Sequence, residues 1–249
     1  MKNTLKVDMN KFKKIWFLGI IYIAIVFVLF VSFSSLFGST AQKILPYTQV
    51  ASVADLTNQN VDSIYGILWF IVFLLVLFVA LQLAAYAFFE HTIWNVIFGK
   101  KTTAKSTGKF LGFSLLMSLL LAVAVGGVFL VISFISSLST SLAKPGAWTF
   151  YLAASYGLYA LFIGFIVFTK THVVFKSIPE TFAVSFKKLK HTGIPFVISV
   201  IILLATNAII ALFAWLPKPA FSTLIAVSFA AYLAWFRLYL VESLKSVKF

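Results

Sequence analysis

The chain has 249 residues, of which 62% are hydrophobic and 10% are charged. Soluble domains contain about 45–50% apolar and about 25% charged residues, so a water-soluble fold could not cover its surface with this composition, and lipid must surround much of the chain. The 20 basic and 6 acidic residues give a net charge of +14, and the lack of cysteine excludes disulfides, thiolate metal sites and cysteine nucleophiles.

Six stretches without charged residues predict six membrane-spanning helices. They run over about 15–37, 64–89, 110–135, 148–169, 194–216 and 219–236. A helix needs about 20 residues to cross a hydrocarbon core of about 30 Å, so each stretch is adequate, although the last is short. It ends at Arg237, whose long side chain is expected to reach the lipid headgroups. Membrane-spanning strands would alternate apolar and polar residues, which these stretches do not do, so the chain is predicted to be an all-α integral membrane protein.

The first stretch also has features of a secretory signal peptide. Lysines precede it, and the small residues Ser39 and Ala41 after it could form a cleavage site. The hydrophobic part of a signal peptide is about 7–15 residues long, and this stretch is longer. An uncleaved span is the favoured interpretation, and cleavage remains the alternative.

The basic residues predict the orientation of the spans. All but three of the 20 lie before span 1, between spans 2 and 3, between spans 4 and 5, or after span 6. The three on the other side are Lys43, Lys144 and Lys218. Because lysine and arginine concentrate in cytoplasmic connections, both termini are predicted to be cytoplasmic in a multi-pass protein of the cell membrane.

The spans are predicted to form three hairpins within a single membrane domain, 1–249. The hairpin repeats cover about 1–90, 91–170 and 171–249, and an amphipathic cytoplasmic segment precedes each pair of spans. In the third of these segments an apolar stripe of Ile178, Phe182 and Phe186 lies beside lysines, which is typical of a helix at the inner leaflet. Ser177 and Glu180 predict a capping box at its start.

The lysines of these segments predict membrane lipids with anionic headgroups as partners. The candidate contacts are Lys13, Lys14, Lys100, Lys101, Lys187 and Lys188. Nucleic acid is not an expected partner, because the lysines lie beside spans and no basic segment has room for a groove-reading module.

The returning span of each hairpin carries small residues four apart. The set is Ala80, Ala84, Ala153, Gly157, Ala160, Gly164, Ala226, Ala230 and Ala234. This spacing keeps small side chains on one helix face and lets a second backbone approach closely, which is how helices associate in lipid. Their partner could be a neighbouring span, a membrane protein partner or a second copy of the chain, and a chance recurrence of alanine is the alternative.

Residues with catalytic chemistry are sparse. No two carboxylates are spaced as an acid–base pair, and His91 and His172 occupy similar places in the repeat without a cysteine or aspartate to complete a metal site. No catalytic residue, cofactor or metal is predicted. The polar residues Asn207, Gln82 and Tyr156 lie inside spans, where polar groups are costly, and form a candidate intramembrane site.

The layout of amphipathic segment and hairpin, used three times, resembles a broad group of uncharacterised six-helix membrane proteins. The group includes the membrane domain attached to some bacterial glycerophosphodiester phosphodiesterases, and the likeness is clearest over Ser177–Leu204. The resemblance implies a membrane-embedded helper and carries over no functional residues. The predicted function is a non-enzymatic scaffold or lipid-handling membrane component; the alternative is a permease or channel subunit for a small uncharged solute.

Overall fold

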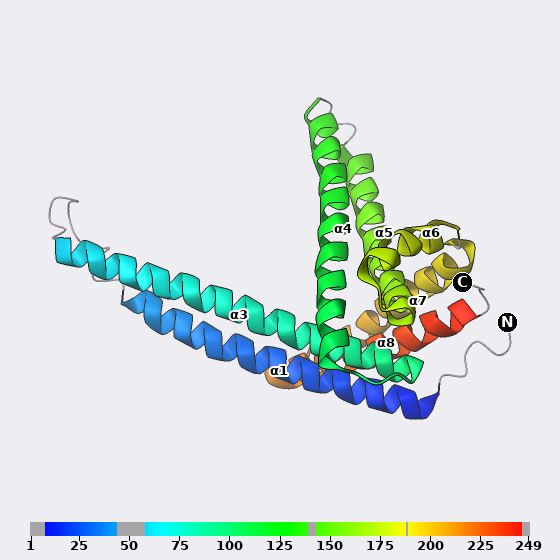
Figure 1. The fold of residues 1–249 in the computed structure, drawn as a ribbon, viewed down its shortest axis with the longest axis horizontal. Coiled ribbons are helices and arrows are strands. Elements are labelled where there is room, and N and C mark those ends of the chain that lie inside the picture. Colours follow the sequence, from blue (N-terminus) through cyan, green and yellow to red (C-terminus); the bar gives the residue numbers. More distant parts are fainter. Residues whose placement is uncertain (1–7, 44–57, 139–142, 188, 246–249) are drawn as a thin grey trace. The chain divides into compact units, whose positions relative to one another are not determined.

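The computed structural model describes residues 8–43, 58–138, 143–187 and 189–245, which form helices and no strands (Figure 1). The helices are α1 (Met9–Gln42), α3 (Asn58–Phe98), α4 (Ala104–Leu138), α5 (Ala143–Thr171), α6 (Val174–Lys187), α7 (Leu189–Ala211) and α8 (Lys218–Lys245). Six of these, all except α6, are long and apolar enough to cross a membrane. This confirms the predicted all-α class with six spanning helices.

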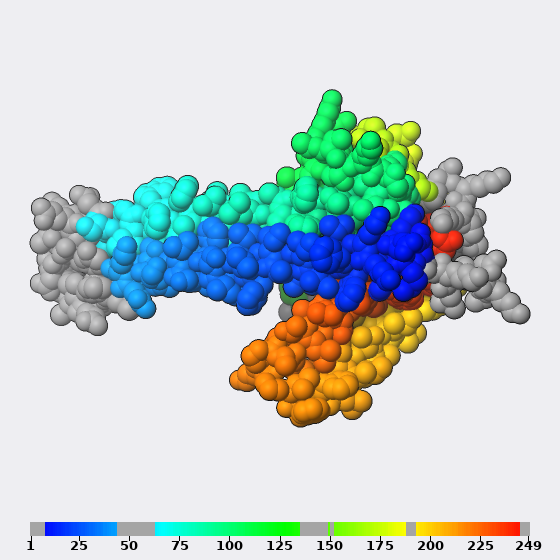
Figure 2. Space-filling view, turned by 90° about the horizontal axis from the view of Figure 1, so that it is seen from below, coloured from blue at the N-terminus to red at the C-terminus, as the bar shows by residue number. Residues whose placement is uncertain are grey.

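The chain divides into two compact units, which are described separately. One contains Met1–Ile20 and Phe89–Phe249, and the other contains Ile21–Phe88. The single domain 1–249 and its three hairpin repeats remain predictions. In the second unit, α1 and α3 run antiparallel and side by side (Figures 1 and 2). Phe33 packs between them with its ring centroid 5.0 Å from that of Phe78.

The buried side chains of the first unit concentrate in one region, here called the base. The base comprises residues 9–20 of α1, 89–98 of α3, 104–117 of α4, 159–171 of α5, all of α6, 193–199 of α7 and 230–244 of α8. Aromatic rings fill its centre: Phe113 stacks on Phe168 at 5.0 Å, and Phe110 lies 5.2 Å from Phe165. Such pairs add directional contacts to the area that the rings bury.

Two helical pairs extend from the base and are here called the arms. They are residues 118–138 of α4 with 143–158 of α5, and residues 200–211 of α7 with 218–229 of α8. Many of their large apolar side chains are exposed, among them Leu119, Phe129, Leu130, Leu152, Leu158, Ile201, Leu204 and Ile209. Continuous apolar surface of this kind is stable in hydrocarbon, so the arms are the parts of this unit that most need lipid around them.

Helix ends differ from the predicted span ends in all six spanning helices. The helices α1, α4, α5 and α8 extend beyond the predicted stretches, α8 as far as Lys245. The second span was predicted to end at residue 89, but α3 continues to Phe98 and ends in a Schellman motif, in which Lys100 N donates to Asn95 O and Gly99 has φ +66°. The fifth span was predicted to reach Leu216, but α7 ends at Ala211. The turn that follows is built from backbone bonds between residues three apart, from Leu212 N to Ile209 O as far as Leu216 N to Phe213 O.

The three segments that precede the hairpins differ in structure. The first is continuous with its span in α1, whose N-terminus Asp8 caps by accepting from Asn10 N at 3.0 Å. The second is continuous with α4, and the third forms a separate helix, α6. The predicted N-cap role of Ser177 is wrong: α6 begins at Val174, and the Ser177 hydroxyl donates to the Val173 carbonyl within the helix.

Candidate functional site

An ion pair joins two distant helices inside the base. Glu90 of α3 accepts a hydrogen bond from Nη2 of Arg237 on α8, and both side chains are more than nine-tenths buried. The expectation that Arg237 reaches the headgroups is therefore wrong. Its guanidinium is held by a carboxylate, which removes the need to reach water, because a buried charge is tolerated when it is paired.

A hydrogen-bond network lies one turn further along α3. Asn95 Nδ2 donates to His91 Nε2 at 3.1 Å and to Thr102 Oγ1 at 3.2 Å. His91 Nδ1 lies 3.1 Å from Thr107 Oγ1, which itself donates to the Thr103 carbonyl. A neutral imidazole with its hydrogen on Nδ1 satisfies both contacts. The network thus ties the end of α3 to the start of α4.

Lys100 caps the C-terminal end of α5. Its Nζ donates to the Thr169 carbonyl at 2.5 Å and to His172 Nε2 at 3.1 Å. A cation is favourable at this position, because the last carbonyls of a helix have no intrahelical partner and carry partial negative charge. Burial, and after it the positive charges of Lys100 and Lys109, lowers the pKa of the His172 imidazole below its ordinary value.

The other candidate lipid-contact lysines have different surroundings. Lys13, Lys14, Lys101 and Lys187 are exposed, and Lys188 lies outside the described residues. Lys11, which is not among these candidates, donates to the Ile97 carbonyl at 3.0 Å and so links α1 to α3. Exposed lysines remain available to headgroups, and the lipid contacts remain predictions.

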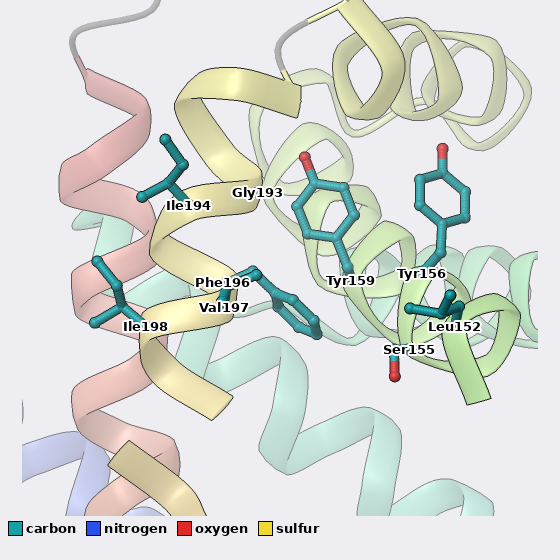
Figure 3. A pocket seen from close by; sticks show the side chains of 9 residues that line it. All are labelled: Leu152, Ser155, Tyr156, Tyr159, Gly193, Ile194, Phe196, Val197 and Ile198. Carbon is teal, nitrogen blue, oxygen red and sulfur yellow. The ribbon is translucent and has the colours of Figure 1, made fainter. Parts of the chain in front are cut away.

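An apolar groove of about 670 Å³ opens between α5 and α7 (Figure 3). Its lining consists of Leu152, Ser155, Tyr156, Tyr159, Gly193, Ile194, Phe196, Val197 and Ile198. The Tyr156 hydroxyl lies 3.1 Å from Ser185 Oγ on α6, and the Tyr159 hydroxyl donates to the Ser185 carbonyl at 3.5 Å. The hydroxyls thus engage α6, while the tyrosine rings line the groove.

The three residues of the candidate intramembrane site have different surroundings. Of its three residues Tyr156 lines the groove, whereas Asn207 is exposed and donates from Nδ2 to the Leu203 carbonyl of its own helix at 2.9 Å. Gln82 is half-buried on α3 and belongs to the other compact unit. A polar site formed by Asn207 and Gln82 therefore remains a prediction.

The small residues of the returning spans fall into two groups. Several lie at close contacts in the first unit: a Cβ on Gly157 would lie 3.4 Å from Val125 Cγ2, and one on Gly164 would lie 3.0 Å from Phe113 Cζ. Ala160, Ala230 and Ala234 are buried, and Ala153 and Ala226 are half-buried. Ala80 and Ala84 of the second unit are exposed.

Comparison with known proteins gives no match. No family model, no curated protein and no solved structure matches the chain. The resemblance to six-helix membrane proteins therefore remains a prediction.

Sequence reasoning missed the main polar contacts of the base. One feature of the sequence could have indicated the Glu90–Arg237 pair. Arg237 is the only arginine in the sequence, and both residues lie directly after a predicted span. Asn95 and the helix-capping role of Lys100 carried no comparable signal. Their partners are set by how α3, α4 and α5 meet, which periodicity does not specify.

Proposed function

We propose that the chain is a non-enzymatic, multi-pass component of the cell membrane that holds lipid or a membrane partner against its helical arms. One observation carries the proposal: the polar groups best suited to chemistry bind one another and join helices. Glu90 pairs with Arg237, and His91 is held between Asn95 and Thr107. Groups engaged in this way fix the base and leave the exposed apolar arms as the surface that meets other molecules.

The proposed orientation places the base at the cytoplasmic face. It is supported by Lys105 and Lys109 of the base and by Lys101 in the connection between α3 and α4, because basic residues concentrate on that side of a membrane. The chain has no cysteine, so single cysteines at Lys101 and Lys218 report the two faces without background. In intact cells, a membrane-impermeant maleimide should label Lys218→Cys and not Lys101→Cys. The reverse pattern would overturn the orientation.

The helper role implied by the resemblance to six-helix membrane proteins agrees with this proposal. A helper of this kind contributes contacts with lipid or with another membrane protein, and it needs no reacting group of its own. The packing in the base supplies what such a role requires, which is a fixed geometry at the point where α3, α4, α5 and α8 meet.

Purified full-length protein in liposomes tests the function with three readouts. We expect stoichiometric phospholipid to remain bound after detergent exchange, as measured by native mass spectrometry. We also expect neither hydrolysis or transfer on phospholipid and phosphoester substrates nor flux of small uncharged solutes above that of empty liposomes. Turnover that is lost in His91→Ala or His172→Ala would establish an enzyme, and flux that is lost in Asn207→Leu would establish a permease; either result would overturn the proposal.

A further inference from the structure

The groove between α5 and α7 has walls suited to an aliphatic occupant. Leu152, Ile194 and Val197 line it and are more than half exposed, so the groove opens to the surroundings of the helices. Both helices contain segments long and apolar enough to cross a membrane, so hydrocarbon is the medium expected around them. Its volume of about 670 Å³ falls within the range of roughly 300–1,000 Å³ typical of sites for small organic ligands.

Polar contacts lie where the groove meets α6, and a lysine follows these contacts in the sequence. Ser185 of α6 engages the two tyrosine hydroxyls there, and the Phe186 ring lies 5.2 Å from that of Tyr156. The next residue is Lys187, which is exposed at the end of α6. The acidic residue that precedes Lys187 in the sequence is Glu180, two helical turns earlier in α6, and none follows until Glu242.

An occupant that satisfies both ends has an aliphatic chain and an anionic head. We propose that this groove binds one acyl chain of an anionic phospholipid, with the phosphate of the headgroup at Lys187. The apolar walls hold the chain, the tyrosine rings mark the level where hydrocarbon gives way to the headgroup region, and Lys187 supplies the complementary charge. The inference rests on the lipid-handling part of the proposed function and assigns it a site and a lipid class.

A second groove in the same unit provides an internal control. It lies between α4 and α5, encloses about 310 Å³, and is lined by Ser118, Leu121, Ala122, Val125, Ala154, Gly157, Leu158 and Leu161. It is apolar like the first groove, but its lining contains no tyrosine. Ser118 and Ser155 are both exposed serines, one in each lining, so the same substitution can fill either groove.

The test uses the full-length chain in liposomes that contain a phospholipid with a photoreactive diazirine on its acyl chain. The headgroup is either phosphatidylglycerol, which is anionic, or phosphatidylcholine, which is zwitterionic. With phosphatidylglycerol we expect crosslinks to concentrate at residues 152–159 and 193–198, as mapped by peptide mass spectrometry. Ser155→Trp should reduce this labelling about tenfold, which corresponds to about 1.4 kcal/mol of binding free energy, while Ser118→Trp should leave it unchanged.

The headgroup part of the inference has its own pair of variants. Lys187→Gln should lower labelling by phosphatidylglycerol to the level of phosphatidylcholine, whereas Lys105→Gln, at an exposed lysine near the start of α4, should preserve the difference. Both lysines are exposed, so neither substitution disturbs a buried contact. The inference is overturned by equal labelling with the two lipids, by labelling that persists in Ser155→Trp, or by crosslinks between two copies of the chain at the groove.

The outcomes separate this inference from the proposed function. Retained phospholipid that labels the arms evenly would remove the groove site and leave the lipid-handling function. Concentrated labelling at the groove together with catalytic turnover would keep the site and overturn the non-enzymatic function.

Discussion

The base and the arms hold their helices together by different contacts. In the base, aromatic rings stack and buried polar groups bind one another across the ends of several helices, as Glu90 and Arg237 do. In the arms, a small residue packs against an apolar side chain, as Gly157 does against Val125. Many large apolar side chains of the arms remain exposed. In lipid, exposed apolar residues provide little force between helices, so the specific contacts of the base are expected to carry most of the stability of this unit.

The largest expected effect comes from leaving one charge of the base unpaired. Arg237→Met should lower the free energy of unfolding by about 3–5 kcal/mol, because Glu90 would stay buried without its partner. The double variant Glu90→Leu with Arg237→Met should recover most of that loss, because apolar replacement of a buried pair is often neutral or stabilising. Unfolding in detergent followed by circular dichroism measures both, and Lys101→Met, at an exposed lysine, is the control. An Arg237→Met loss no larger than that of the control would show that the pair contributes little.

A glycine-to-leucine pair compares base and arm directly. Gly164→Leu should cost about 1–3 kcal/mol, because its Cβ would lie 3.0 Å from Phe113 Cζ in a stack with Phe168 that leaves the ring little room to move. Gly126→Leu in the arm should change stability by at most about 0.5 kcal/mol, since no atom lies within 4 Å of a Cβ there. Equal losses in the two variants would remove the distinction between tightly packed base and open arm.

Removing the cation at the end of α5 should have a smaller effect. Lys100→Met should cost about 0.5–1.5 kcal/mol, because the Thr169 carbonyl would lose its charged donor. Hydrogen exchange should increase mainly in the last turn of α5, and Lys101→Met serves again as the control. Uniform acceleration throughout the base would show that Lys100 supports the whole base and not one helix end.

The smallest expected effect is a dependence on pH through His172. The pKa of this imidazole is lowered in the fold, so the folded state binds a proton less readily than the unfolded state does. The contribution to stability is therefore complete above the ordinary histidine pKa of about 6.5 and is lost as the pH falls below it. His172→Asn should reduce this acid sensitivity, since asparagine tolerates the φ of 53° at this position. Melting curves from pH 7.5 to about 5 compare the two proteins, and identical slopes would contradict the prediction.

The arms could be predicted from the sequence because hydropathy alone specifies a spanning helix. Stretches such as 110–135 contain no charge over a length that crosses a bilayer, and the helices follow. The base could not be predicted in the same way. The charge at Glu90 was taken as the end of a span, yet the helix continues to Phe98 and the carboxylate is buried against Arg237.

The short helix α6 shows why side-chain pattern alone misses contacts of this kind. Its apolar residues Phe175 and Phe186 are exposed, while Ser177, Thr181 and Ser185, spaced four apart, are buried. Small hydroxyl residues allow a close approach and offer hydrogen bonds, and in a lipid environment that is a stronger reason to pack than hydrophobicity. A hydropathy profile gives these three residues little weight, so the Tyr156–Ser185 contact at the end of the groove carried no signal in the sequence.

The Glu90–Arg237 pair also has a consequence for biosynthesis. The two residues are 147 positions apart, and a ribosome adds about 5–20 residues per second. Arg237 is therefore synthesised on the order of ten seconds after Glu90. Until α8 is translated and inserted, the nascent chain carries an uncompensated acid beside its second span. A carboxylate made early in α3 is therefore neutralised only when α8 has been made, and a chain that stopped before α8 would keep Glu90 without its partner.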